Sequence, residues 1–234
     1  MRHRIRCQGR EIKQFIDNLT CSNGGRHAYY RALRAFYNWL YSAKSGYDLK
    51  PQNNPILIVD APKVEKEILP SLTPEQVNHL IEQVDNLRDK AIISLFADGG
   101  MRLRELANIK ASDIDWESYT ITIWGKGNKQ RKAPSKERTA SLLRQWIPHN
   151  GTGGNIRGVN AHGIQTMLRR LGLRTGLPCN PHTFRRTFAS NLHRVGMEIE
   201  HIMRLGDWES LEMVLRYTRS VKFDDSLRLY RAMV

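Results

Sequence analysis

Apolar residues follow a helical spacing over residues 10–45 of the chain, where they recur three and four positions apart. This period places them on one face of a helix, which can then pack inward. The pattern pauses at Asn23-Gly24-Gly25, which is expected to separate a first helix from a second. The two predicted apolar faces comprise Ile12, Phe15, Ile16 and Leu19, followed by Tyr29, Leu33, Phe36, Tyr37 and Leu40.

Residues 46–70 interrupt this periodicity with a glycine and repeated prolines. Proline lacks a backbone N–H and disfavours a helix in the residue before it, so the segment is predicted to be extended and to contain a domain boundary. The expected division is a short helical domain over residues 1–62, a linker over 63–70 and a second domain over 71–234.

Helical patterns resume after the linker. Thr73-Pro74-Glu75-Gln76 combines a capping residue, a first-turn proline and an acid, which is typical of a helix start. Further helices are expected over 87–97, from near residue 102 to before 110, over 139–147, over 160–171 and, with breaks at Gly196 and Gly206, from 182 to the end.

The spacing changes to period two between residues 119 and 133. The alternation over 119–124 predicts a strand, Gly125-Lys126-Gly127-Asn128 a turn, and residues 129–133 a returning strand. The predicted fold class is therefore mainly α with one small antiparallel β-sheet.

The charge balance indicates a polyanionic partner. The 234 residues contain 37 Lys and Arg against 23 Asp and Glu, which gives a formal net charge of +14. Nucleic acid is the partner that such an excess favours, with a ribosomal or generally basic protein as the alternative. Arg26, Arg31 and Arg34 lie among the apolar positions of the second helix, whose outer face could follow a DNA backbone or be an ordinary solvated surface.

Cysteine usage and hydropathy indicate the compartment. Cys7, Cys21 and Cys179 are scattered and form no CxxC pair, which favours a reducing environment without a disulfide framework or zinc cluster. No apolar run approaches the length of a bilayer span, and no apolar segment follows the basic N-terminus as a signal peptide would require. We expect a soluble cytoplasmic protein that associates with the nucleoid.

Candidate groups for phosphate chemistry begin with Arg102. It follows Gly99-Gly100-Met101 at a predicted helix start, where backbone N–H groups also favour an anion. Glu105, one turn later, could orient the guanidinium. Taken alone, the pair is more typical of a surface arginine and a first-turn acid.

Two further motifs add a proton donor and a second cation. Lys126 lies between two glycines at the predicted hairpin tip, where an ammonium could reach a phosphate and protonate a leaving oxygen. His182 and Arg185 are three residues apart on one helix. A guanidinium can hold two phosphoryl oxygens, and a histidine can carry a proton near neutral pH.

A nucleophile completes the set. Tyr217 follows Trp208 by nine positions. A phenol is a weak nucleophile unless cations stabilise its phenolate, and its attack on a phosphodiester would conserve the bond energy in a phosphotyrosine. Tyr230 is the second candidate. Two acidic pairs could hold metal ions in principle, but caps and surface charges explain them better: Asp113 with Asp115, and Asp224 with Asp225.

In this order the motifs resemble the tyrosine recombinase, or phage integrase, family. Gly-Met-Arg-x-x-Glu-Leu at 100–106 is similar to its first arginine motif, and Gly-Lys-Gly-Asn-Lys-x-Arg at 125–131 to its lysine hairpin. His182 and Arg185 match its His-x-x-Arg box. Trp208 stands where members have His or Trp, and Tyr217 matches the nucleophile.

The resemblance covers residues 70–220 as a tyrosine recombinase catalytic domain. Residues 26–62 resemble the end of the helical core-binding domain that precedes it, so 1–62 would be a partial version of that domain. A homotetramer on paired double-stranded DNA sites is implied, with neither metal nor cofactor. DNA contacts are assigned to Arg26, Arg31, Arg34, Lys129 and Arg131.

The resemblance also implies a role for each catalytic residue. Arg102 and Arg185 would hold the scissile phosphate, while Tyr217 attacks it. Lys126 would protonate the leaving 5′ oxygen. The remaining implied roles are tyrosine proton transfer by His182, hydrogen-bond donation by Trp208 and support of Arg102 by Glu105.

Two other functions stay open at this point. A type IB topoisomerase uses similar groups to relax DNA as a monomer, and a DNA-binding protein with a decayed site would bind without cutting. Base readout depends on which side chains enter a groove, so the motifs do not indicate the target sequence.

Overall fold

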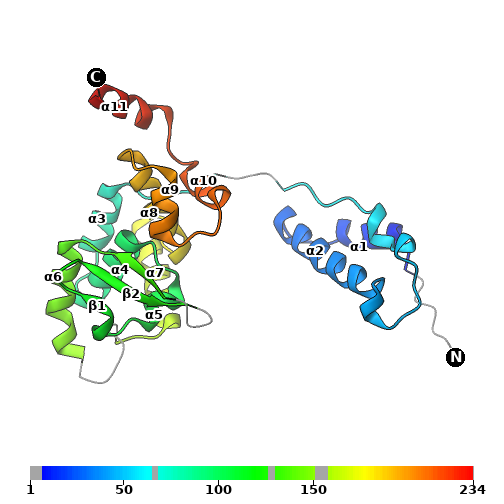
Figure 1. Cartoon of the computed structure of the whole chain (residues 1–234), viewed down its shortest axis with the longest axis horizontal. Coiled ribbons are helices and arrows are strands. Elements are labelled where there is room, and N and C mark those ends of the chain that lie inside the picture. The colour runs from blue at the N-terminus through cyan, green and yellow to red at the C-terminus, as the bar shows by residue number, and fades with distance from the viewer. Residues whose placement is uncertain (1–6, 65–67, 126–129, 151–157, 234) are drawn as a thin grey trace. The chain divides into compact units, whose positions relative to one another are not determined.

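The computed structural model describes residues 7–64, 68–125, 130–150 and 158–233 (Figure 1). The chain divides into two compact units, residues 1–67 and residues 68–234. Among the described residues no helix is both long enough and apolar enough to cross a membrane. All three cysteines are free thiols.

Two helices, α1 (Gly9–Asp17) and α2 (Asn23–Leu40), form most of the N-terminal unit. The Ser22 hydroxyl caps α2 by accepting a hydrogen bond from the Gly25 N–H at 3.2 Å. The prediction that Asn23-Gly24-Gly25 separates the helices is therefore wrong, because these residues form the first turn of α2. Residues 18–22 make the connection instead.

The buried face of α2 also differs from the predicted one. Tyr30, Tyr37 and Leu40 are buried, whereas Tyr29 and Phe36 are each 50% exposed. Aromatic residues occupy the neighbouring positions 29–30 and 36–37, so both sets satisfy the helical repeat. Packing against the rest of the unit decides which set is buried.

The segment expected to be an extended linker belongs in part to this core. Residues 51–53 and 55–58 form short 3-10 turns, and Ile56 and Val59 are buried with the helices. The Asn54 side chain accepts a hydrogen bond from the Ile56 N–H at 3.1 Å and donates one to Asn38 at 3.1 Å. Proline presets the backbone for such turns as readily as for extended chain, which is why composition misassigned the segment.

The C-terminal unit contains the predicted helices and hairpin. Its three-stranded antiparallel sheet has the order β1-β2-β3, and β1 is an addition to the two predicted strands. The strands are β1 (Ile114–Asp115), β2 (Thr120–Trp124) and β3 (Gln130–Pro134). The helices are α3 (Pro74–Glu82), α4 (Leu87–Gly99), α5 (Leu103–Asn108), α6 (Glu137–Trp146), α7 (Ala161–Thr175), α8 (Pro181–Arg194), α9 (Ile199–Gly206), α10 (Leu211–Thr218) and α11 (Phe223–Met233). The mainly α fold class with a small antiparallel sheet is confirmed.

Helix α4 is at the centre of this unit and packs against α3, α6 and α8. It is buried almost all round because apolar residues occupy every face, and Phe96 stacks on Phe184 of α8 with ring centroids 5.7 Å apart. Helix α3 begins at the predicted capping residue, and the structure adds a capping box in which Thr73 and Gln76 exchange hydrogen bonds.

A second apolar cluster joins α8, α9 and α10, which lie side by side (Figure 1). Phe188 on α8, Ile202 on α9 and Val214 on α10 are buried in it together with Trp208. This cluster holds the segment after α9 and the helix that carries Tyr217 against the helix that carries Arg185.

Candidate active site

Arg102 owes its position to the turn that ends α4. Gly100 has a left-handed φ of 55°, and a Cβ there would lie 2.5 Å from a ring carbon of Phe188. The backbone conformation and the lack of space for a side chain therefore both favour glycine at this position. Met101 is then buried and Arg102 becomes the residue that caps α5. Its guanidinium is about half exposed and therefore accessible to a ligand.

Glu105 binds Arg102 from the next turn. One carboxylate oxygen accepts the Arg102 backbone N–H at 2.8 Å and the other accepts Nη1 at 2.6 Å. Burial alone would raise the pKa of Glu105, but the Arg102 backbone hydrogen bond and the Arg131 guanidinium outweigh it, so the pKa lies below its usual value. Glu105 is therefore an ionised carboxylate that orients Arg102.

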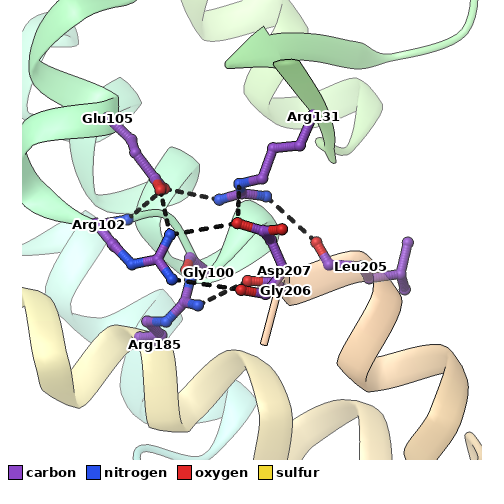
Figure 2. A network of polar contacts seen from close by, with 8 residues as sticks. All are labelled: Gly100, Arg102, Glu105, Arg131, Arg185, Leu205, Gly206 and Asp207. Atoms are coloured by element: carbon purple, nitrogen blue, oxygen red, sulfur yellow. Dashed lines mark hydrogen bonds and ion pairs between the residues drawn. The ribbon is translucent and has the colours of Figure 1, made fainter. Parts of the chain in front are cut away.

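Arg131 of β3 forms the other half of this network (Figure 2). Its Nη2 donates to Glu105 at 2.7 Å, and its Nη1 donates to the Leu205 carbonyl at 3.3 Å. Arg131 was predicted to contact DNA, yet its side chain is only 12% exposed. The register explains this position, because Arg131 pairs with the buried Ile123 and cross-strand partners point to the same face of a sheet.

Arg185 lies on the buried face of α8. Its Nη1 donates to the Gly100 carbonyl at 2.5 Å and its Nη2 to the Gly206 carbonyl at 2.6 Å (Figure 2). Burial, together with the charge of Arg102, lowers its pKa to about 10, so the guanidinium remains charged at neutral pH. The two hydrogen bonds fix Arg185 beside Arg102 and between the turns that follow α4 and α9.

Trp208 connects Arg185 to Tyr217. The Arg185 guanidinium carbon lies 4.4 Å from the centroid of the Trp208 ring, and the Trp208 and Tyr217 ring centroids are 5.5 Å apart. The indole is 4% exposed, and its buried Nε1 finds no acceptor among the described residues. A buried donor without a partner is costly, which favours a ligand as its acceptor.

Tyr217 is half-buried near the end of α10. Burial lowers the pKa values of Arg185 and Arg186, and a negative charge on the Tyr217 oxygen would act in the opposite direction on both guanidinium groups.

Three serines connect the backbone of Tyr217 to the rest of the unit. The Ser190 hydroxyl on α8 donates to the Tyr217 carbonyl at 2.8 Å. The Ser190 and Ser220 hydroxyls are 2.9 Å apart, and those of Ser220 and Ser71 are 2.7 Å apart. This hydroxyl chain ties the end of α10 to α8 and to the segment before α3. The sequence carried no signal for it, because isolated serines far apart in the chain have no motif.

Asp207 is the charged residue of the site that the sequence did not single out. One carboxylate oxygen lies 3.4 Å from Arg102 Nη1 and 3.9 Å from Arg131 Nε (Figure 2). Its backbone has a left-handed φ of 53°, which is uncommon for a residue other than glycine. The Gly206-Asp207-Trp208 turn was visible in the sequence, but its proximity to Arg102 depends on tertiary packing.

The other predicted residues lie apart from this network or outside the described residues. His182 is exposed on the first turn of α8, one turn before Arg185. Arg26 donates from Nε and Nη2 to the Leu19 carbonyl, while Arg31 and Arg34 are exposed on α2. Lys126 and Lys129 lie outside the described residues.

Three members of the acidic pairs, Asp113, Asp115 and Asp225, serve as caps or ion-pair partners. Asp113 and Asp115 accept hydrogen bonds from nearby backbone N–H groups, and Asp225 accepts them from Lys222 and Arg228. Within the described ranges no group of three or more His, Cys, Asp or Glu residues could hold a metal ion. The assembled groups include the Arg102 and Arg185 guanidinium groups, the unsatisfied Trp208 N–H and the Tyr217 hydroxyl, a set suited to a tetrahedral oxyanion such as a phosphodiester.

Comparisons with known proteins agree with this chemistry. Residues 70–222 match the phage integrase family. A tyrosine recombinase XerC of Syntrophus aciditrophicus (strain SB) is 29% identical over 211 residues, covering 80% of this chain and 66% of the relative. A tyrosine recombinase XerC of Anoxybacillus flavithermus (strain DSM 21510 / WK1) is 31% identical over 222 residues, covering 84% of this chain and 71% of the relative.

Solved structures show the same fold. The XerH site-specific recombinase bound to a palindromic difH substrate, in a post-cleavage complex, has a TM-score of 0.78 at 20% identity over 97% of this chain and 72% of that one. The crystal structure of XerA recombinase has a TM-score of 0.64 at 24% identity, covering 97% of this chain and 84% of that one.

The chain spans just under two thirds of the length of the first XerC relatives, with 66% for Syntrophus aciditrophicus and 65% for Xanthomonas campestris. The family match nevertheless extends over well more than half of this chain, from before α3 to the end of α10. It includes Arg102, Arg185, Trp208 and Tyr217, which the fold brings together. The chain belongs to the phage integrase family of tyrosine recombinases.

Proposed function

We propose that this protein is a site-specific DNA recombinase that cuts and rejoins strands through a covalent 3′-phosphotyrosine. The convergence of Arg102, Arg185, Trp208 and Tyr217 carries the proposal, since the start of α5, helix α8, the turn after α9 and helix α10 supply the groups for one phosphate. The XerC relatives, named tyrosine recombinases, support recombination over simple DNA relaxation.

The cationic groups act on the scissile phosphate. Arg102 and Arg185 hold its non-bridging oxygens, and the unpaired Trp208 N–H donates a third hydrogen bond to them. These groups stabilise the charge that builds as the phosphorus becomes five-coordinate. Glu105 and Arg131 touch no substrate in this scheme and serve to keep Arg102 in place.

Strand cleavage exchanges one ester for another. The Tyr217 oxygen forms a bond to phosphorus while the bond from phosphorus to the 5′ oxygen breaks. Lys126 supplies the proton that the departing 5′ oxygen takes up, and His182 accepts or returns the phenolic proton. Reversal with a 5′ hydroxyl from another strand rejoins the DNA, so the exchange consumes no ATP and requires no metal or cofactor.

The remaining parts of the chain bind and pair the DNA. Residues 1–62 act as a helical core-binding domain, 63–70 as a linker and 71–234 as the catalytic domain. Arg26, Arg31, Arg34 and Lys129 contact the duplex, and four protomers assemble on two paired sites in the cytoplasm. The net charge of +14 supports a polyanionic partner. The Tn1549 transposon integrase, a structural neighbour, has been solved in complex with a circular intermediate DNA.

A covalent trapping assay tests the proposal. Sequencing of DNA trapped on the protein in cells identifies the target, and a nicked suicide duplex of that sequence is then incubated with the protein. We expect the parent protein to give a covalent band on a denaturing gel, and Tyr217→Phe to abolish it. Tyr230→Phe, which alters a 65% exposed tyrosine, should retain the band. DNA binding without a band would indicate a decayed site, and relaxation of a supercoiled plasmid without two-site exchange would indicate a topoisomerase.

A further inference from the structure

We propose that Asp207 is a counter-ion switch, which holds Arg102 in the DNA-free protein and moves to Arg131 when a phosphate occupies Arg102. The inference rests on the proposed function, because Arg102 must be a phosphate ligand for the displacement to occur. It assigns a role to the exposed carboxylate of the site, whereas the other carboxylate, Glu105, is buried between Arg102 and Arg131.

Asp207 occupies the part of Arg102 that a phosphate would use. Its carboxylate oxygen lies 3.4 Å from Nη1, and its backbone carbonyl accepts a hydrogen bond from Nη2 at 3.3 Å. Contacts to both terminal nitrogens resemble the two-point grip with which a guanidinium binds an oxyanion. A phosphate that arrives at this edge meets a negative charge, so the carboxylate must move away from Arg102.

A second position for the carboxylate lies beside Arg131. Two of the three nitrogens of this guanidinium are engaged by Glu105 and by the Leu205 carbonyl. Its Nε is buried without a hydrogen-bond acceptor among the described residues, and it lies 3.9 Å from the same Asp207 oxygen. A small shift of the carboxylate would satisfy this donor and keep the negative charge next to a cation.

The main chain of Asp207 is held in place while its side chain is exposed, so the side chain can move alone. The residue caps α9 in the left-handed conformation, and its N–H donates to the Arg204 carbonyl at 3.4 Å, which holds the main chain. The carboxylate itself is 56% exposed, so it can rotate into water on leaving Arg102. Asparagine and glycine both tolerate this backbone conformation, and each removes the charge.

Phosphate binding to the whole DNA-free chain tests the first position of the switch. Thermal unfolding of Asp207→Asn, Asp207→Gly and the parent is followed against inorganic phosphate, which stabilises a folded state that binds it. We expect both variants to bind phosphate about fivefold more tightly than the parent, which corresponds to about 1 kcal/mol of binding free energy. The effect is small because solvent screens the half-exposed Arg102–Asp207 pair. Glu209→Gln is the control, because Glu209 is exposed and makes no ion pair with a described residue. Equal phosphate affinity in parent and both variants would overturn the proposal.

Cleavage of the suicide duplex tests the second position. In the Tyr217→Phe background, which cannot cleave, we expect Asp207→Asn to bind the duplex more tightly than its parent. In the Tyr217 background, saturating Asp207→Asn should cleave about fivefold more slowly, because its neutral amide cannot supply the negative charge that the carboxylate brings to Arg131. If Asp207 only supported the fold, its substitution would weaken both DNA binding and cleavage, and this result would contradict the proposed switch. If the parent itself forms no covalent band, the proposed function fails, while the phosphate titration still reports on Asp207.

Discussion

Removing the Glu105 carboxylate should destabilise the C-terminal unit by about 3 kcal/mol. The Glu105 side chain is 9% exposed and accepts three hydrogen bonds of 2.6–2.8 Å, from the Arg102 backbone, Arg102 Nη1 and Arg131 Nη2. In Glu105→Ala the Arg131 guanidinium stays buried with the Leu205 carbonyl as its hydrogen-bonded partner. Breaking a buried ion pair costs about 3–5 kcal/mol, and the half-exposed Arg102 reduces this figure.

Urea unfolding followed by tryptophan fluorescence measures this loss. Four of the five tryptophans lie in residues 68–234, so the signal reports mainly on the C-terminal unit: Trp116, Trp124, Trp146 and Trp208. Glu105→Gln keeps one oxygen acceptor and should lose about 1–2 kcal/mol. Glu117→Ala, at an exposed position, is the matched control and should change little. A loss below about 0.5 kcal/mol for Glu105→Ala, with an unchanged urea dependence, would refute the reasoning.

The acid response gives the same experiment a second readout. The pKa of Glu105 is lowered in the folded state, so its contribution is complete above its unfolded pKa of about 4.3 and declines as the pH falls through the lower folded value. The stability difference between the parent and Glu105→Gln should therefore shrink in acid. A difference that stays constant down to pH 2 would contradict the ion-pair explanation.

Three further outcomes test the site and its DNA. Trp208→Phe keeps a ring against Arg185 but removes the buried N–H, so single-turnover cleavage should slow about 10²-fold with unchanged DNA affinity; an unchanged rate would remove Trp208 from catalysis. Ser190→Ala releases the Tyr217 carbonyl and should slow cleavage about tenfold without weakening DNA binding, whereas Ser141→Ala, at an exposed position of α6, should change neither. The logarithm of DNA affinity should fall linearly with the logarithm of salt concentration, by about 0.9 per phosphate neutralised, and a flat response would exclude backbone-dominated binding.

Interactions between residues close together in the chain account for the secondary-structure elements that the sequence predicted. Helix starts such as Thr73 to Gln76 are determined by side chains that satisfy nearby backbone groups, and the β2–β3 hairpin by alternation over a few residues. The proposed catalytic residues could be named because their short motifs, taken together and in order, resemble those of a known family. The stripe on α2 was misplaced because neighbouring aromatic residues make two helical faces equally apolar.

The sequence by itself therefore determined the helices, the hairpin and the identity of the residues suited to phosphate chemistry, since these depend on neighbours in the chain. Tertiary structure alone decided that Arg131 supports Glu105 from the buried face of β3, that Ser190 holds the backbone of Tyr217, and that Asp207 faces Arg102. Those relations join residues that are 26, 27 and 105 positions apart. No local pattern encodes such separations, because they arise only when helices and strands pack around a common core.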